Sequence, residues 1–463
     1  MFHPDMVKRV WLVGIGGIGM SALARYFHRM QMPVAGYDRT PSAVTDALTN
    51  EGIEVFFSDD PELIHHSFRH KEGTLVIYTP AVPASQRQLL YFREQGFDVQ
   101  KRSEVLGLIT RGAEAICVAG THGKTTISTL VAHLFRHSDN GCTAFLGGIS
   151  KNFGTNFLLD EKSPFVVLEA DEFDRSFLHL TPSVALVSAV DADHLDIYGD
   201  GDEVRKAFTD FALRIPQGGV LVTKAGLDIS WQLNDGVDLV TYSATAEADF
   251  YATDIVLKND GTYSFSLVTP EEIITDLNMG IPGMINVENA VGACALALLK
   301  GVKPSELTRA LPAFKGIARR FDTHIKTKNM VYIDDYAHHP EEIRATLNSI
   351  KAIYPHFRLV GVFQPHLYSR TRDFAEAFGQ VLSLLDELYL LDIYPAREEP
   401  IPGVDSRLIG QYVHNIPVWY GSRDHLIANL RYKPPMVLVT MGAGDIDRIV
   451  FPLTEWLKQL GVE

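Results

Sequence analysis

A glycine-rich loop followed by lysine and threonine lies in the middle of the chain. Residues 119–126 read Ala-Gly-Thr-His-Gly-Lys-Thr-Thr, between the apolar run 115–118 and a segment, 127–135, with helical spacing. A strand, a glycine loop and a helix in this order form a phosphate-binding loop, in which backbone N–H groups surround the phosphates, the lysine reaches their oxygens and the threonine hydroxyl binds magnesium. The pattern predicts a nucleoside triphosphate site made of Gly120, Thr121, His122, Gly123, Lys124, Thr125 and Thr126.

Acidic residues follow two further strand-like runs in the same part of the chain. The first cluster, 169–174, contains Glu172, and the second, 191–196, contains His194. Carboxylates this close repel one another unless a cation is present. Taken alone, each cluster is equally typical of a solvated loop or a helix N-cap. Two clusters after strands of one phosphate-loop domain favour a metal site, to which Thr125 and His194 would also contribute.

A different glycine loop opens the chain. Gly14, Gly16 and Gly19 match G-x-G-x-x-G between the apolar run 10–13 and a helix, and Asp38 ends the next strand-like run. This spacing predicts a site for a diphosphate-containing nucleotide, of which a dinucleotide is the default. A tight turn without a ligand is the structural alternative. A nicotinamide-dependent oxidoreductase would explain this loop but would leave the Gly-Lys-Thr loop without a role.

Length and composition exclude several classes of protein. A chain of 463 residues is too long for one core, and its 46% apolar and 21% charged residues are typical of a globular protein. The absence of a long apolar run and of a signal-peptide layout argues against a membrane or secreted protein. Three scattered cysteines favour the reducing cytoplasm. A net charge of −15 argues against nucleic acid as a partner.

Apolar runs alternate with helix-length segments along the chain, which predicts an α/β protein with parallel sheets. A turn signal at 259–262 between two alternating segments predicts a hairpin, and therefore some antiparallel sheet. We expect domain boundaries near Gly112 and Gly316, which give domains 1–112, 113–316 and 317–463. The predicted strands are 10–13, 34–37, 74–78, 115–119, 165–169, 184–189, 330–333, 359–363, 387–391 and 436–440.

Taken together, these motifs resemble those of the Mur ligase family, the ATP-dependent amide-forming enzymes of peptidoglycan precursor synthesis. The resemblance covers nearly the whole chain. Beyond the two glycine loops and the acidic clusters, it rests on the runs 286–289, 319–321, 334–340, 364–366, 371–373, 393–400 and 440–445.

The resemblance implies a Rossmann-like UDP-sugar domain, a central ATPase domain with a mixed sheet and a C-terminal Rossmann-like domain. It also implies a ligand for each motif. Lys124 and Thr125 would bind ATP phosphates and Mg²⁺, Glu172 and His194 would be magnesium ligands, and Asn286 and Asn289 would lie near the adenine. The diphosphate of a UDP-sugar would be held by Gly14, Gly16, Gly17, Ile18, Gly19, Met20, Ser21 and Asp38.

The member that the motifs match best joins L-alanine to UDP-N-acetylmuramate through an acyl phosphate. Because a carboxylate must approach a triphosphate, positioned cations are needed, and the candidates are Lys124, Arg319, Arg320, Arg370 and Arg372. His338 and His339 would orient the substrate or accept the amine proton, and His338 is the candidate for the base. The C-terminal part would then have to close over the central one. The structural alternative for Arg319 and Arg320 is a surface pair in a linker. For Arg370 and Arg372 it is a salt bridge at a helix start, which the sequence without the family context favours.

Two alternatives and two departures stay open. A recycling ligase would join a whole murein peptide to UDP-N-acetylmuramate, and a nucleotide-binding regulator would do no chemistry. Leu367 stands where many relatives carry arginine, and Ile285 where histidine is frequent. The sequence leaves open whether the protein is a monomer or a homodimer.

Overall fold

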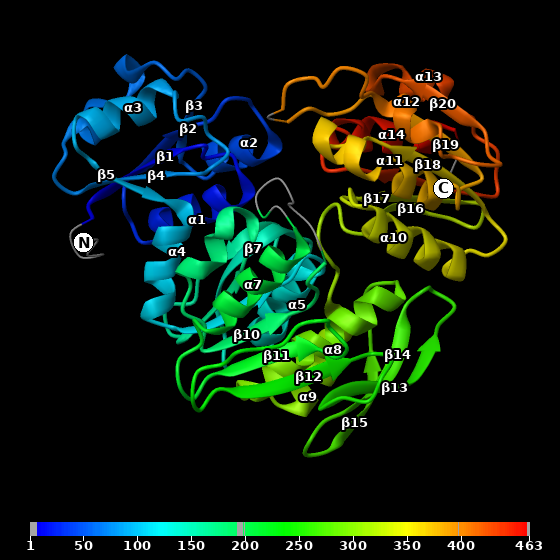
Figure 1. The fold of residues 1–463 in the computed structure, drawn as a ribbon, viewed down its shortest axis with the longest axis horizontal. Coiled ribbons are helices and arrows are strands. Elements are labelled where there is room, and N and C mark those ends of the chain that lie inside the picture. The colour runs from blue at the N-terminus through cyan, green and yellow to red at the C-terminus, as the bar shows by residue number, and fades with distance from the viewer. Residues whose placement is uncertain (1–6, 192–197, 199, 397, 461–463) are drawn as a thin grey trace. The chain divides into compact units, whose positions relative to one another are not determined.

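The computed structural model describes residues 7–191, 198, 200–396 and 398–460. They divide into two compact units. Unit 1 comprises Met1–Val256, Ser264–Gly280 and Val287–Lys315, and unit 2 comprises Leu257–Tyr263, Ile281–Asn286 and Gly316–Glu463. Figure 1 shows three sheets with their helices, of which the first two belong mainly to unit 1 and the third to unit 2.

The first sheet has five parallel strands in the spatial order β3-β2-β1-β4-β5. This order matches the first five strands of the doubly wound Rossmann order 3-2-1-4-5-6. Its strands are β1 (Arg9–Val13), β2 (Val34–Tyr37), β3 (Glu54–Phe56), β4 (Thr74–Tyr78) and β5 (Asp98–Lys101). Its helices are α1 (Ile18–Arg29), α2 (Ala43–Asn50), η2 (Pro61–Leu63), η3 (His66–Arg69), α3 (Arg87–Glu94) and α4 (Arg102–Arg111).

The second sheet has ten strands in the order β15-β14-β13-β12-β11-β10-β6-β9-β7-β8. It is mixed, because β7 pairs antiparallel with β8 and β14 with β15, while the strands around β6 are parallel. Its strands are β6 (Glu114–Ala119), β7 (Thr143–Ser150), β8 (Thr155–Leu158), β9 (Phe165–Glu169), β10 (Val184–Val187), β11 (Val220–Lys224), β12 (Asp238–Ser243), β13 (Phe250–Leu257), β14 (Tyr263–Val268) and β15 (Ile273–Asn278). Its helices are α5 (Lys124–Arg136), η4 (Phe173–His179), α7 (Gly201–Ala212), α8 (Met284–Leu299), α9 (Pro304–Ala310) and η5 (Leu311–Ala313).

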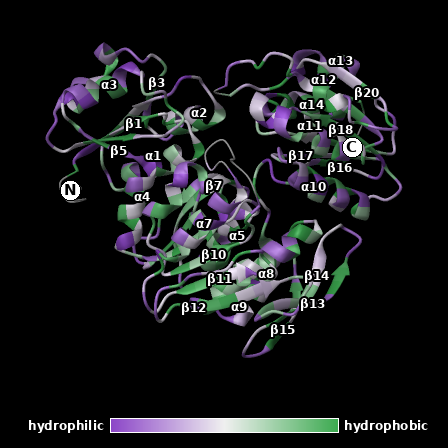
Figure 2. Cartoon of the chain, in the orientation of Figure 1, coloured by the Kyte–Doolittle hydropathy of each residue, from purple (hydrophilic) through white to green (hydrophobic). Residues whose placement is uncertain are grey.

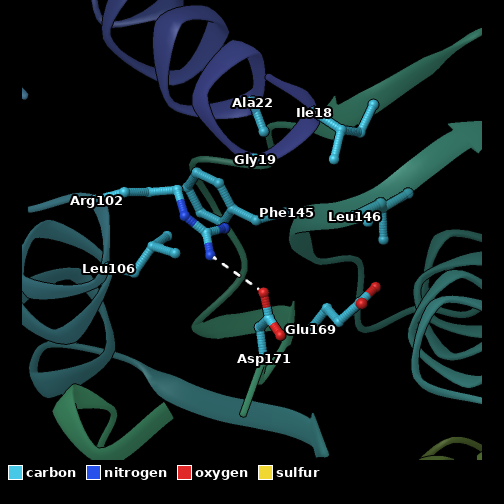
Figure 3. A pocket seen from close by; sticks show the side chains of 10 residues that line it. Ile18, Gly19, Ala22, Arg102, Leu106, Phe145, Leu146, Glu169 and Asp171 are labelled. Atoms are coloured by element: carbon cyan, nitrogen blue, oxygen red, sulfur yellow. Dashed lines mark ion pairs between the residues drawn. The ribbon is translucent and has the colours of Figure 1, made fainter. Parts of the chain in front are cut away.

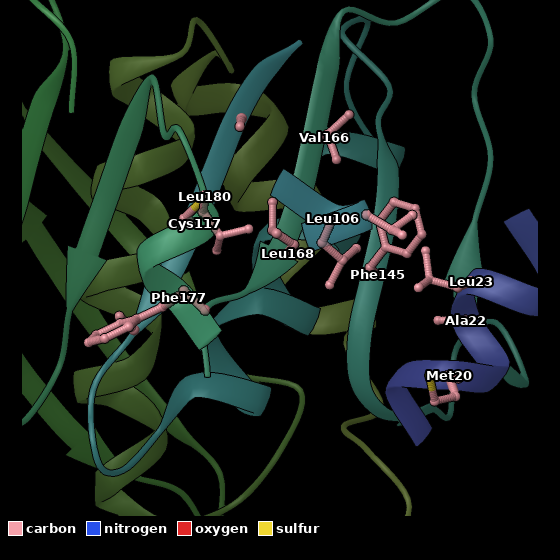
Figure 4. Packing of buried hydrophobic residues seen from close by; sticks show 14 of the residues in the cluster. Met20, Ala22, Leu23, Leu106, Cys117, Phe145, Val166, Leu168, Phe177 and Leu180 are labelled. Carbon is pink, nitrogen blue, oxygen red and sulfur yellow. The ribbon is translucent and has the colours of Figure 1, made fainter. Parts of the chain in front are cut away.

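The two sheets of unit 1 share an apolar core, part of which is drawn in Figure 4. Helix α1 fills the space between them, and its Tyr26 ring lies 5.5 Å from Phe145 on β7 and 6.0 Å from Phe157 on β8. A buried polar contact accompanies this packing, because Asn156 Nδ2 donates to the Ile18 carbonyl at 2.5 Å. The helix that follows the first glycine loop is therefore fixed to the sheet that carries the second.

The third sheet, in unit 2, has the order β16-β17-β21-β18-β19-β20, and only its edge strand β16 is antiparallel to its neighbour. Its strands are β16 (Asp322–Lys326), β17 (Met330–Asp335), β18 (Arg358–Phe363), β19 (Glu387–Leu391), β20 (Val418–Gly421) and β21 (Met436–Met441). Its helices are α10 (Pro340–Ile353), α11 (Tyr368–Leu382), α12 (Ser406–Gly410), η6 (Arg423–His425), α13 (Leu426–Asn429) and α14 (Asp447–Gln459).

Both faces of the third sheet are covered. Val331 and Ile333 of β17 point into one apolar cluster, while Met330 and Tyr332 point into the cluster on the opposite face. This alternation follows from the two-residue period of a strand, and burial on both sides explains why the strands read as continuous apolar runs. Figure 2 shows hydrophobic residues concentrated along the strands. In the described ranges, no helix is both long enough and apolar enough to cross a membrane.

The predicted α/β class, with a Rossmann-like first part, a mixed central sheet and a Rossmann-like last part, is confirmed. Every predicted strand is present within one or two residues at either end, and β13 and β14 flank the predicted turn as neighbours. The prediction missed nine strands, which lie mostly at or near sheet edges: β3, β5, β7, β8, β11, β12, β15, β16 and β20. The boundaries at residues 112 and 316 stay predictions.

A buried histidine joins α5 to the end of α9. His133 is fully buried, its Nε2 lies 2.8 Å from the carbonyl oxygen of Ala310, and its ring packs 5.3 Å from that of Phe314. Burial lowers the pKa of His133 from 6.5 to about 4, against the opposing effect of that carbonyl. The imidazole is therefore neutral at pH 7.

This histidine predicts an acid-sensitive fold. Between pH 6.5 and 4 the unfolded chain binds a proton at His133 that the folded chain does not, so the contribution is complete above pH 6.5 and is lost as the pH falls towards 4. When the pH falls from 7 to 4.5, the wild type should lose on the order of 2 kcal/mol more unfolding free energy than His133→Asn. Urea unfolding at pH 7 and pH 4.5 measures it. Parallel pH curves for the two proteins would contradict the assignment.

Candidate active site

The second glycine loop leaves the carboxyl end of the buried strand β6 and leads directly into α5. Gly120 has φ 126° and Gly123, the N-cap of α5, has φ 83°, both in the left-handed region that favours glycine. A Cβ at Gly120 would overlap Ser188 Oγ, which follows the neighbouring strand β10. The loop is therefore packed against the end of the next strand, and its two glycines allow that close approach.

Lys124, the first residue of α5, bridges the loop to an acidic residue. Its Nζ donates to the Gly120 carbonyl at 2.7 Å and lies 2.8 Å from Glu172 Oε1, whose side chain is 2% exposed. Burial opposes the charge on the Lys124 ammonium, but Glu172, Asp171 and Glu169 outweigh it and raise its pKa. Burial also raises the pKa of Glu172 to about 7, against the effect of Lys124. The carboxylate therefore requires a cation beside it.

The first acidic cluster and Asp191, the one described residue of the second, lie at the edge of the sheet from which the loop leaves. Asp171 and Glu172 follow β9, and Asp191 follows β10, on either side of β6. Thr121 Oγ1 donates to Asp191 Oδ2 at 3.3 Å, and His122 Nε2 lies 3.4 Å from the same oxygen. The phosphate loop, Asp171, Glu172 and Asp191 therefore all lie at the carboxyl ends of parallel strands. Open α/β sheets bind their ligands at this end of the strands.

The predicted magnesium ligands are described only in part. Thr125 is the second residue of α5, next to Lys124, and Glu172 lies at the same edge, whereas His194 lies outside the described residues. Among the described side chains, no group of three or more His, Cys, Asp or Glu forms a metal site. A hydroxyl and a carboxylate nevertheless fit Mg²⁺, which usually takes one or two carboxylates and completes its shell with water and substrate phosphates.

Asp38, which directly follows β2, forms a hydrogen bond with the backbone of the first glycine loop. Asp38 Oδ2 accepts the Gly16 N–H at 2.7 Å, and Gly17 caps α1 without a side-chain hydrogen bond to the helix. Met20 and Ser21 are buried in the first turn of α1, where the Ser21 N–H donates to the Gly17 carbonyl at 2.8 Å. The predicted UDP-sugar residues thus come together at the amino end of α1, where backbone N–H groups favour an anion.

The two predicted adenine residues lie on α8. Asn286 and Asn289 are both buried. Asn286 Nδ2 donates to the Pro282 carbonyl at 2.6 Å, while a Cβ at Gly123 would lie 2.9 Å from Asn289 Oδ1. Asn289 is therefore brought next to the phosphate loop, and the adenine role of both residues stays a prediction.

In unit 2, the predicted site residues other than Arg372 lie near the carboxyl ends of β17, β18 and β21. Arg319, with a left-handed φ of 65°, lies 3.1 Å through Nε from Asp334 Oδ2 and donates through Nη2 to the Gly442 carbonyl at 2.7 Å. Asp334 is fully buried and also accepts a hydrogen bond from Thr440. Arg319 is therefore occupied by the internal structure of the unit.

Arg320, His338 and Arg370 lie around Tyr336 and Glu342. Arg320 lies over the Tyr336 ring at 5.0 Å, and His338 Nδ1 lies 3.0 Å from the Tyr336 carbonyl and 3.3 Å from Glu342 Oε2. Two acceptors near Nδ1 favour its protonation and leave the lone pair on Nε2. Burial, together with the nearby Arg370 charge, lowers the pKa of His338 to about 4 against the opposing effect of Glu342. A neutral imidazole is the form that accepts a proton.

Arg372 is not brought into this group. Its side chain is 54% exposed on α11, where Nε lies 2.7 Å from Asp373 Oδ1. Of the two departures from the family pattern that the sequence suggests, Leu367 is 8% exposed and Ile285 is 44% exposed. The catalytic roles of Arg320, Arg370, Arg372 and His338 stay predictions.

The sequence interpretation missed two groups next to the phosphate loop. Ser188 donates through Oγ to the carbonyls of Ala119 and His122, and the Tyr198 hydroxyl donates to the Glu172 carbonyl at 2.5 Å. A serine after a predicted strand is a weak signal, and no motif marks the tyrosine. Both fix the backbone that carries Lys124 and Glu172.

Comparison with known proteins agrees with this geometry. Three family models match successive parts of the chain: the Mur ligase family catalytic domain at residues 9–114, the Mur ligase middle domain at 118–297 and the Mur ligase glutamate ligase domain at 319–444. Since these models cover most of the sequence, the chain belongs to the Mur ligase family.

Proteins that resemble this chain over nearly its full length are named UDP-N-acetylmuramate–L-alanine ligase. UDP-N-acetylmuramate–L-alanine ligase of Porphyromonas gingivalis is 50% identical over 98% of this chain and 100% of its own, and that of Parabacteroides distasonis is 49% identical over 98% and 99%. The crystal structure of UDP-N-acetylmuramate–alanine ligase from Thermotoga maritima matches with a TM-score of 0.83 at 26% identity, covering 98% of this chain and 99% of that one. A murein peptide ligase of Psychrobacter arcticus shares the fold, with a TM-score of 0.72 at 22% identity over 97% and 98%.

Arg319 and Arg372 should differ in their effect on stability, because Arg319 pairs with a buried carboxylate and Arg372 with an exposed one. Arg319→Ala leaves Asp334 buried without its cation and should destabilise unit 2 by about 3–5 kcal/mol. Arg372→Ala removes an exposed pair and should change the unfolding free energy by less than about 0.5 kcal/mol. Urea unfolding of both variants provides the comparison, and equal losses would contradict the structural role of Arg319.

Proposed function

We propose that this protein catalyses the ATP-dependent addition of L-alanine to UDP-N-acetylmuramate. The observation that carries the proposal is the Lys124 ammonium, held between the Gly120 carbonyl and the buried Glu172 in a phosphate-binding loop. The family membership and the full-length relatives named UDP-N-acetylmuramate–L-alanine ligase support the same reaction.

The chemistry follows from the difficulty of making an amide from a carboxylate. The oxygen of a carboxylate is a poor leaving group, so one lactyl oxygen attacks the γ-phosphorus of ATP, and ADP leaves. The nitrogen of L-alanine then attacks the acyl carbon, the C–O bond to phosphate breaks, and the amine loses a proton. Lys124 stabilises the charge of the phosphoryl group in transfer.

The remaining groups have supporting roles in the proposal. Mg²⁺, held by Thr125 and Glu172, would neutralise phosphate charge when bound. The backbone of residues 14–21 would hold the diphosphate of the UDP-sugar at the amino end of α1. His338, neutral and with its lone pair on Nε2, would accept the amine proton, and Arg320 and Arg370 would supply positive charge.

Two other functions compete with this one. The recycling ligase shares the fold, but the proteins of high identity over the full length carry the L-alanine name. The nicotinamide-dependent oxidoreductase is not favoured, because a family of ligases gives both glycine loops a role without hydride transfer.

A phosphate-release assay tests the proposed function. We expect phosphate release in the presence of UDP-N-acetylmuramate, ATP and magnesium to depend on L-alanine. The murein tripeptide and D-alanine serve as controls. No L-alanine dependence would contradict the proposal, and dependence on the tripeptide instead would select the recycling ligase.

Substitution of Lys124 tests whether the two glycine loops bind different ligands. Lys124→Ala should reduce turnover by at least about a thousandfold while the dissociation constant for UDP-N-acetylmuramate changes less than threefold, because the lysine serves the ATP site only. Calorimetric titration and the phosphate assay measure the two effects. Lys300→Ala, which removes a 3.0 Å pair with Glu114 in the same unit, is the matched control. Equal loss of binding and turnover would show that the two sites are not separate.

A further inference from the structure

A small cavity lies beside the first turn of α1 in unit 1 (Figure 3). It measures about 80 Å³, and its walls come from α1, α4, β7 and the segment that begins at the end of β9. Gly19, Arg102, Phe145, Glu169 and Asp171 are among the residues that line it. The cavity is small beside a nucleotide, so it admits one small group of a larger ligand.

Arg102, the first residue of α4, directs its guanidinium into this cavity. A Cβ at Gly19 would overlap Arg102 Nη1, so the absence of a side chain at Gly19 makes room for the cation. Arg102 Nη2 lies 3.7 Å from Asp171 Oδ2, which is longer than a hydrogen bond. The Arg102 side chain is 20% exposed, and at 3.7 Å its N–H donors lie beyond hydrogen-bond distance of Asp171.

The charges of the cavity wall favour an anionic group at Arg102 alone. Of the lining residues, all of which the structure describes, Arg102 is the one cation, and Glu169 and Asp171 are acidic. An anion would be repelled by these carboxylates except where the guanidinium faces it. Its planar fork matches carboxylate and phosphate oxygens in pairs.

The position of Arg102 relates the two proposed sites. Gly19 lies in the first turn of α1, where the UDP-sugar diphosphate is proposed to bind, and Asp171 precedes Glu172, which holds Lys124. A substrate that extends from α1 towards the phosphate loop would pass this cavity. Arg102 is therefore placed to meet an oxyanion along that path.

We propose that the Arg102 guanidinium binds an oxyanion of the nucleotide-sugar substrate, exchanging its loose contact with Asp171 for that group. The inference rests on the proposed function, because it takes its ligand from that reaction. The oxyanion is a diphosphate oxygen or the lactyl carboxylate, which offer a guanidinium the same chemistry. No bond is made or broken at Arg102.

Calorimetric titration of the full-length protein with UDP-N-acetylmuramate, and separately with UDP, tests the proposal. Arg102→Gln should weaken binding of UDP-N-acetylmuramate about tenfold or more, and Arg102→Lys should recover part of the loss. An equal loss for UDP assigns the diphosphate, and an unchanged affinity for UDP assigns the lactyl carboxylate. Either outcome supports the role of Arg102.

Lys101→Met is the matched control, because Lys101 lies next to Arg102 and pairs with Asp174 at 3.1 Å without lining the cavity. Its affinities should match those of the wild type, and thermal unfolding shows whether each variant is folded. Wild-type binding retained within twofold by both Arg102 variants would overturn the inference. Failure of the wild type itself to bind UDP-N-acetylmuramate would instead overturn the proposed function.

Discussion

The buried contact between Lys124 and Glu172 is the interaction on which the first unit depends. An ion pair removed from water contributes little net stability, since the desolvation of both charges offsets their attraction. A protein that keeps such a pair 2.8 Å apart, with the carboxylate 2% exposed, retains it for another reason. In the proposed function, the reason is that the pair holds the Lys124 ammonium in place at the end of a phosphate-binding loop.

This one contact constrains much of the surrounding architecture. Lys124 must open α5 immediately after the β6 strand, and Glu172 must follow a strand paired directly with β6. Parallel pairing places both carboxyl ends at one edge of the sheet. Gly120 must be a glycine, because Ser188 occupies the space that a side chain would need. Unit 2 likewise pairs a basic side chain with a buried carboxylate at the carboxyl ends of its strands, because Arg319 is held by Asp334.

The sequence predicts those parts of the fold and site that short segments encode. Gly120 to Lys124 form one continuous motif, and buried parallel strands such as β6 and β9 appear as continuous apolar runs. Contacts between distant segments are not encoded in this way. Nothing in the sequence shows that Asp38 forms a hydrogen bond with the first glycine loop or that Arg102 lines a cavity. Nor does it show that Arg319 pairs with a buried carboxylate while Arg372 is exposed. Edge strands such as β3 and β5 are short and partly exposed, so they lack a strong apolar signal.

The central claim is that the Gly120–Thr126 loop activates a carboxylate by transferring a phosphoryl group to it. The most direct measurement uses UDP-N-acetylmuramate labelled with ¹⁸O in the lactyl carboxylate, together with ATP, magnesium and L-alanine, and determines the isotope in the released phosphate by mass spectrometry. Each released phosphate is expected to carry one oxygen from the carboxylate. Phosphate that carries no label while the amide product forms would contradict this claim.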